Sequence, residues 1–230
     1  MHGPRVGHPD FLPAGAPRSE ANKTGAEFTV HLTAQIEELD ASVGKVFSAL
    51  KELGVEKNTI VLFMSDNGGS RGTSMGPLKG GKGSMYEGGP RTPFLIHWPE
   101  SIPAGKVSHE IGVSSDLLPT LAKLCGGKLS GNRIDGHDLS DLFLNPDTAK
   151  SPHEGFAHKG KAYRLGKWKM VGKQLFDLEK DLGETHNLAK QYPEVLKKLN
   201  DKANEFFSKI EGEIRPCLLY TSDAADDRVS

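Results

Sequence analysis

Residues 60–93 read IVLFMSDNGGSRGTSMGPLKGGKGSMYEGGPRTP, and this stretch decides the fold predicted for the 230-residue chain. Its first part belongs to the continuous apolar run Thr59–Met64, which is typical of a parallel strand covered on both faces. Asp66 and Asn67 fall at or just past the carboxyl end of this strand. Because ligand sites in open α/β sheets lie outside the carboxyl ends of strands, the acid–amide pair is a candidate site for a hard cation.

Further elements are predicted on both sides of this strand. Apolar residues recur at helical spacing from Ile36 to Leu53, and Gly54 is placed to end that helix as a left-handed C-cap. A second strand is predicted at Phe94–Trp98 and a second helix at Asp116–Leu124. Ser114 or Ser115 is expected to cap this second helix, and Gly126 to end it. The alternation of helix, strand, glycine loop, strand and helix indicates an α/β layer.

The pattern changes to short strands from about Ser151. Three strands are predicted, at Ala162–Leu165, Trp168–Val171 and Leu175–Leu178. The connections Gly166-Lys167 and Gly172-Lys173-Gln174 suit tight hairpins that begin with glycine. The segment Pro193–Ile210 is predicted to be an amphipathic helix whose apolar face covers the antiparallel sheet. The residues predicted for that face are Val195, Leu196, Leu199, Ala203, Phe206 and Ile210.

The motifs SDNGG, PLKGGKG, YEGGPRTP and HWP follow one another in an order and spacing that resembles the sulfatase family of the alkaline-phosphatase-like superfamily, near its arylsulfatase and N-acetylgalactosamine-sulfatase types. The resemblance runs from about Phe28 to about Pro216 and includes SSDLLPTLAKLCG, IDGHDLSDLF and QLFDLEKDLGETHNLA. It implies an α/β fold. The expected architecture is the C-terminal part of an alkaline-phosphatase-like α/β sandwich, with a small antiparallel-sheet-and-helix subdomain.

The resemblance also predicts the domain organisation. Residues 28–150 are expected to form the C-terminal part of the sulfatase α/β domain, and residues 151–216 the α+β subdomain. Residues 1–27 are interpreted as an irregular leader. Residues 217–230 resemble translated sequencing-adapter read-through and are set aside. The sequence contains no C-x-P-x-R or S-x-P-x-R motif, the site at which sulfatases form formylglycine, so we expect this chain to be the C-terminal half of the enzyme.

Four site residues follow from the resemblance. Asp66 and Asn67 match the last two ligands of a Ca²⁺ site whose other ligands, aspartates, lie in the missing half. Lys82 matches the lysine that contacts the sulfate group, where an ammonium neutralises charge on the sulfuryl and leaving oxygens. His158 is a candidate for contact with the substrate from the C-terminal subdomain. The structural alternatives are an Asx turn at Asp66, a solvated loop lysine and a surface histidine.

The loop around these residues also predicts supporting contacts. Glu87 and Arg91 are interpreted as an internal ion pair that braces the loop, and Lys79 as a structural residue. Pro90 stands where the family pattern usually has an aliphatic residue, and nothing in the sequence explains that substitution.

The activity implied by the resemblance is hydrolysis of a sulfate ester, with a sulfated small molecule or glycan as substrate. Hydrated formylglycine would attack sulfur, and the chain alone is expected to be inactive because it lacks this nucleophile. Three alternatives remain: a phosphodiesterase or phosphonate hydrolase of the same superfamily, a non-catalytic relative, and a nucleotide-binding protein. The last rests on GPLKGGKG, which begins like a phosphate-binding loop but continues with Gly83 instead of Ser or Thr.

Composition excludes some classes of partner. The net charge of −1 gives no nucleic-acid footprint, and no apolar run is long enough to span a bilayer. Relatives of this type are commonly periplasmic, secreted or lysosomal. The sequence does not predict the oligomeric state.

Overall fold

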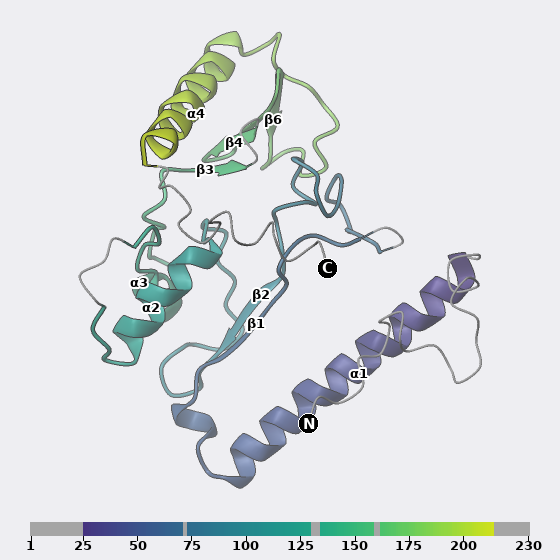
Figure 1. Cartoon of the computed structure of the whole chain (residues 1–230), viewed down its shortest axis with the longest axis vertical. Coiled ribbons are helices and arrows are strands. Elements are labelled where there is room, and N and C mark those ends of the chain that lie inside the picture. The colour runs from purple at the N-terminus through teal and green to yellow at the C-terminus, as the bar shows by residue number, and fades with distance from the viewer. Residues whose placement is uncertain (1–24, 71–72, 130–133, 159–161, 214–230) are drawn as a thin grey trace, which may run out of the picture. The chain divides into compact units, whose positions relative to one another are not determined.

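The computed structural model describes residues 25–70, 73–129, 134–158 and 162–213 (Figure 1). The chain divides into two compact units, Met1–Glu154 and Gly155–Ser230. The first unit contains α1 (Gly25–Glu52), η1 (Glu56–Asn58), β1 (Val61–Met64), β2 (Phe94–His97), η2 (Ser114–Asp116), α2 (Leu117–Leu124) and α3 (Ser140–Leu144). The second contains β3 (Gly155–His158), β4 (Ala162–Leu165), β5 (Trp168–Val171), β6 (Gln174–Asp177) and α4 (Pro193–Glu213). None of the helices in the described part of the chain is long and apolar enough to cross a membrane.

The end of α1 confirms the predicted glycine cap. Gly54 has φ +68°, a left-handed conformation that L side chains rarely adopt. Its amide donates to the Lys51 carbonyl at 3.1 Å, and the amide of Val55 donates to the Leu50 carbonyl at 3.0 Å. This pair of bonds is a Schellman motif, which satisfies two of the last carbonyls of the helix and turns the chain toward β1.

The direction predicted for β1 is wrong. It pairs with β2 in antiparallel register, from Val61 opposite His97 to Met64 opposite Phe94. An apolar run indicates burial but not strand direction. Direction is set here by the intervening loop, which closes on itself where the amide of Ser65 donates to the Pro93 carbonyl at 3.3 Å.

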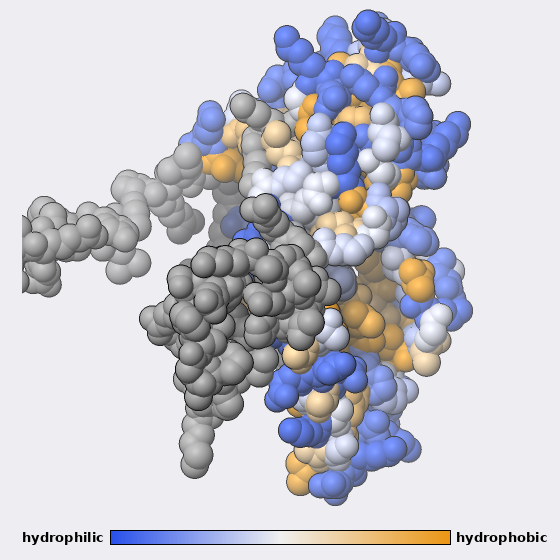
Figure 2. All heavy atoms as spheres, turned by 90° about the vertical axis from the view of Figure 1, so that its right-hand side faces the viewer, coloured by the Kyte–Doolittle hydropathy of each residue, from blue (hydrophilic) through white to orange (hydrophobic). Residues whose placement is uncertain are grey.

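The predicted covering of β1 on both faces is also not observed among the described residues. The side chains of Phe63 and Met64 are 39% and 38% exposed, and Leu95 of β2 is 58% exposed. Figure 2 shows one face of the molecule, on which hydrophobic surface lies between hydrophilic side chains.

The α2 helix ends as predicted but begins differently. Gly126, with φ +68°, follows its last turn. Ser114 and Ser115 do not cap the helix through their side chains. They form the 3₁₀ turn η2, and the Asp116 carboxylate accepts the Val113 amide at 2.8 Å. The expectation of a serine cap was wrong because both serines lie within the 3₁₀ turn, and the residue directly before α2 is Asp116, whose side chain bonds back to Val113 instead of capping α2.

Asp116 is a buried polar centre of the first unit. Its carboxylate accepts the amide of His137 at 2.8 Å as well as that of Val113, and Nε2 of His153 lies 2.7 Å from Oδ2. The residue is fully buried. One carboxylate therefore joins three segments that are far apart in the sequence, and its hydrogen bonds offset the cost of burying it.

The second unit has the predicted meander and one further strand. Its sheet has the antiparallel order β3-β4-β5-β6, and β3 was not predicted. Gly166 and Gly172, with φ +56° and +57°, begin the two hairpin turns as expected. α4 covers the sheet, and the core cluster consists of Tyr163, Met170, Leu175, Leu199 and Ala203.

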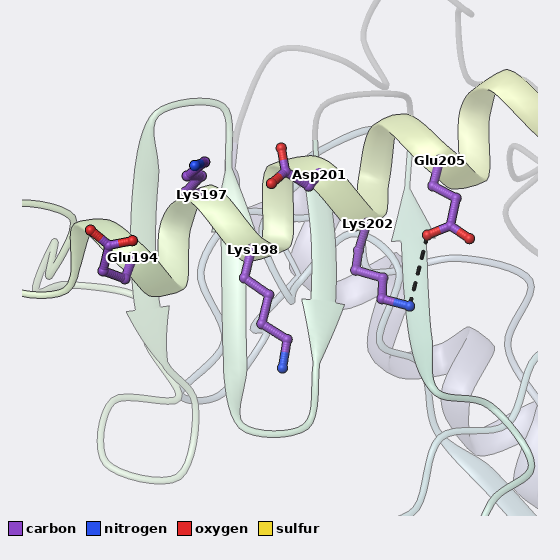
Figure 3. Close-up of a pocket in the computed structure, with 6 residues that line it drawn as sticks. All are labelled: Glu194, Lys197, Lys198, Asp201, Lys202 and Glu205. Atoms are coloured by element: carbon purple, nitrogen blue, oxygen red, sulfur yellow. Dashed lines mark ion pairs between the residues drawn. The ribbon is translucent and has the colours of Figure 1, made fainter.

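The apolar face predicted for α4 is correct near its start and wrong near its end. Val195, Leu196 and Leu199 pack in the core, but Phe206 and Ile210 are 42% and 44% exposed and Phe207 packs instead. Phe206 and Phe207, three and four positions after Ala203, both satisfy helical spacing. Only Phe207 packs against the core of the sheet. The opposite face of α4 is charged and borders a hollow of about 350 Å³, with Lys202 and Glu205 paired at 3.8 Å (Figure 3).

A buried ion pair joins β5 to the loop that follows β6. Nζ of Lys169 lies 3.1 Å from Oε1 of Glu184, and both side chains are almost fully buried. Glu184 also has φ +52°, which is uncommon for a residue with a side chain. The pair fixes the loop in a conformation that the backbone alone would not favour.

The carboxylate of Asp177, at the end of β6, gives the second unit a predicted pH dependence. Burial alone would raise its pKa, but the ion pair with Lys167 at 3.1 Å and the amide of Glu179 outweigh burial and hold the pKa below the ordinary 3.8. The stabilisation is therefore fully present above about pH 4 and is lost as pH falls below 3.8 through the folded-state pKa. We expect Asp177→Asn to flatten the loss of stability between about pH 4 and pH 2 in urea titrations. Asp201→Asn removes an exposed carboxylate on α4 and should leave that pH dependence as in wild type. Equal slopes of stability against pH for the two variants would contradict the assignment.

Candidate active site

The structure places Asp66 and Asn67 in the turn directly after β1. The Ser65 hydroxyl donates to the backbone carbonyl of Asn67 at 2.9 Å and fixes this turn. Asp66 is exposed and Asn67 is half-buried. A carboxylate and an amide oxygen are therefore presented at the carboxyl end of the strand, as the sequence indicated.

The glycines that follow pack backbone against backbone. The amide of Gly68 donates to the Gly89 carbonyl at 2.9 Å, that of Gly88 to Lys79 at 2.8 Å, and that of Lys82 to Gly69 at 2.8 Å. These bonds join segments 68–69, 79–84 and 86–91, which we call the glycine junction. It brings the loop that carries Lys82 beside the turn that carries the acid–amide pair.

The junction has no room for side chains. A Cβ at Gly68 would lie 1.7 Å from the Gly88 carbonyl oxygen, and one at Gly89 would lie 2.0 Å from that of Ser84. A Cβ at Gly88 would lie 2.6 Å from the Lys79 oxygen. The density of glycine in this stretch is therefore a packing requirement, in addition to any need for flexible backbone.

Lys82 borders a hollow of about 490 Å³ on the surface of the junction. Its side chain is exposed, while its amide is held by Gly69. The lining residues are Gly69, Ser70, Thr73, Met75, Gly80, Gly81, Lys82 and Ser84. An ammonium and several hydroxyl groups around a hollow of this size can bind a small anionic group.

The neighbouring charged residues brace the loop. Nζ of Lys79 lies 4.0 Å above the ring of Tyr86, a cation–π contact that agrees with a structural role. Glu87 is buried, and its carboxylate lies 3.5 Å from the guanidinium of Arg91, which confirms the predicted ion pair.

His158 belongs to the second unit. It lies in β3, where its ring stacks on that of Phe156 with centroids 6.3 Å apart and an angle of 17° between the planes. The glycine junction thus brings together three of the four predicted site residues, all in the first unit, and the structure describes His158 only within its own sheet.

Sequence reasoning missed four side chains that line the hollow, namely Ser70, Thr73, Met75 and Ser84. Small polar residues between glycines carry no periodic signal. Met75 offered one clue, because it is an apolar residue inside a polar, glycine-rich loop.

Asp66 and Asn67 fit a Ca²⁺ ion by the chemistry of their oxygens. Calcium takes six to eight oxygen ligands in proteins. Among the described residues, no group of three or more His, Cys, Asp or Glu side chains is close enough to hold a metal ion. The two residues by themselves offer only some of the oxygen ligands that a calcium ion takes.

The described residues thus form a mixed helix-and-sheet chain in which a glycine-rich loop carrying Lys82 lies beside the turn that carries Asp66 and Asn67. The family model described as Sulfatase matches residues 8–127. The chain belongs to the sulfatase family.

Individual relatives agree with the family match. Arylsulfatase A of Homo sapiens is 38% identical over 207 residues, which cover 70% of this chain and 40% of that protein. N-acetylgalactosamine-6-sulfatase of Mus musculus is 41% identical over 144 residues, or 58% of this chain and 27% of that protein. The chain thus spans about two fifths or less of these relatives.

A solved structure matches as well. The crystal structure of Ps i-CgsB in complex with k-i-k-neocarrahexaose has a TM-score of 0.69 and 32% sequence identity, covering 85% of this chain and 47% of that one. The mixed helix-and-sheet class predicted from the sequence is confirmed, although both sheets of the described residues are antiparallel.

The glycine junction predicts a sharp difference between glycines. Gly68→Ala and Gly89→Ala should each destabilise the first unit by about 4 kcal/mol or more, because the new methyl group would overlap a carbonyl oxygen that cannot move without breaking the junction. Gly44→Ala is the matched control, since it lies in α1 with no atom within 4 Å of the added methyl. It should be neutral or slightly stabilising. Urea unfolding of the three variants measures the difference, and similar midpoints would contradict this account.

Proposed function

We propose that this chain is the part of a sulfuric ester hydrolase that binds the sulfate group and supplies some of the metal ligands. One observation carries the proposal. Lys82 is tied through its amide to Gly69, two residues beyond Asn67, and borders a hollow that suits a small anion. Membership of the sulfatase family supports the same conclusion.

Each residue would have a distinct task. The Lys82 ammonium would bind the sulfuryl oxygens and lower the energy of negative charge that develops on the leaving oxygen. The oxygens of Asp66 and Asn67 would hold Ca²⁺, which when bound supplies a Lewis acid for the sulfate oxygens. The nucleophile, formylglycine in the mechanism that the resemblance implies, would come from residues outside these 230.

The substrate of the whole protein is proposed to be a sulfated glycan. The oligosaccharide bound to Ps i-CgsB and the name of N-acetylgalactosamine-6-sulfatase both support this class. His158, in β3, is proposed to contact the substrate, since its imidazole can both donate and accept hydrogen bonds. By resemblance the whole protein would work in the periplasm, outside the cell or in the lysosome.

The role of Lys82 can be tested in a longer reading frame that includes these 230 residues and a formylglycine motif. We expect Lys82→Ala to lower kcat for an aryl sulfate by about 10²- to 10³-fold, as for removal of a group that stabilises developing charge. Lys79→Ala is the matched control in the same loop and should change kcat far less. Equal activity of wild type and Lys82→Ala, or faster release of phosphate from the matching aryl phosphate than of sulfate, would contradict the proposal.

The same reasoning predicts that the 230-residue chain alone releases no sulfate. Charge stabilisation without an attacking group leaves the sulfur–oxygen bond intact, so the purified chain with added Ca²⁺ should match the blank. Release of sulfate that depends on Lys82 would show that the chain carries its own nucleophile.

A further inference from the structure

A single methionine contacts the backbone that holds the Lys82 loop, and we propose that Met75 is a positioning residue for Lys82 in sulfate binding. The inference rests on the proposed function of the hollow, because it assigns a role within that site. The thioether would act on the anion through the backbone of Gly69.

Both the amide and the carbonyl of Gly69 take part in hydrogen bonds. Its amide donates to Sδ of Met75 at 3.0 Å, and its carbonyl accepts the amide of Lys82 at 2.8 Å. A change at the amide side therefore reorients the residue that anchors Lys82. All three residues line the same hollow.

The thioether is in tight contact with this backbone. A Cβ at Gly69 would lie 2.6 Å from Sδ of Met75 and 2.1 Å from Oγ1 of Thr73. The glycine thus lets the sulfur reach the amide, in the way that glycines elsewhere in the junction let carbonyl oxygens approach.

Met75 is also linked to Lys82 along the chain. Its carbonyl accepts the amide of Leu78 at 3.1 Å, which closes the turn that leads to Lys79 and the junction. Met75 is thus connected to Lys82 by the chain, Lys82 to Gly69 by a backbone hydrogen bond, and Gly69 to Met75 by the hydrogen bond to sulfur.

A thioether is a weak acceptor, and methionine often fills gaps simply because it is flexible. The role of Met75 as a hydrogen-bond acceptor can be distinguished from a role in filling space by the substitutions that each role tolerates. Leucine keeps most of the volume but leaves the Gly69 amide without this acceptor, a loss that costs stability at a partly buried group. Glutamine has similar length and offers a carbonyl oxygen.

The test uses the 230-residue chain, with amide hydrogen exchange at Gly69 and Lys82 read by NMR and the affinity for inorganic sulfate measured by calorimetry. We expect Met75→Leu to speed exchange at both amides and to weaken sulfate binding by about 5-fold, the effect of one lost hydrogen bond. Met75→Gln should stay within about 2-fold of wild type. Met85→Leu is the matched control, since Met85 lies in the same loop and is not among the described residues that line the hollow.

The outcomes separate this inference from the proposed function. Sulfate binding that is lost in Lys82→Ala but unchanged in Met75→Leu, with unchanged exchange at Gly69, overturns the role of Met75 alone. Sulfate binding that does not depend on Lys82 overturns the proposed function, and the role of Met75 in the site with it. If Met75→Leu does not fold, sulfate titration of the wild-type chain decides. Joint shifts of the Gly69 and Lys82 amides support the coupling, and a shift of only one of them overturns it.

Discussion

The candidate site depends on how closely backbone can approach backbone at the glycine junction. Hydrogen bonds alone do not explain the composition of this loop, because most residues can donate an amide proton. The short distances between backbone segments explain it, because carbonyl oxygens occupy the positions where Cβ atoms of Gly68 and Gly89 would be. Only glycine permits three segments to meet in this way. The absence of side chains at these glycines allows the turn after β1 and the Lys82 loop to lie side by side.

Elsewhere in each unit, a buried charge organises segments that have few apolar residues. In the first unit, the cluster of buried apolar residues around Leu142 is small, and the Asp116 carboxylate joins η2 to the segments of His137 and His153. In the second, Lys169 and Glu184 fix a loop against β5. Removing one partner of such a buried pair is costly, whereas the intact pair adds little net stability. These groups therefore determine which conformation the loops adopt more than how stable the chain is.

The sequence predicted local features well and tertiary relations poorly. Gly54, Gly166 and Gly172 marked helix and hairpin ends because left-handed backbone is a local property. Strand direction was wrong because it depends on the partner strand, which an apolar run does not specify. Phe206 and Phe207 were indistinguishable by helical spacing, and only the position of the sheet selects between them. The order of the motifs indicated Asp66, Asn67 and Lys82, but nothing in that order indicated Met75, whose contact with Gly69 exists only in three dimensions.

The exposure of Lys82 determines what its charge can contribute. Two unit charges 4 Å apart gain about 1 kcal/mol in water but about 4 kcal/mol near a protein surface with an effective dielectric constant of 20. An exposed ammonium therefore gains less from a free sulfate ion while the hollow is filled with water than it would in a site from which water is excluded. The gain grows when a bulky substrate displaces water from the hollow. An anionic group carried by a large ligand would do so better than a small free anion. This difference requires only that Lys82 stay fixed by Gly69 while the surrounding water changes.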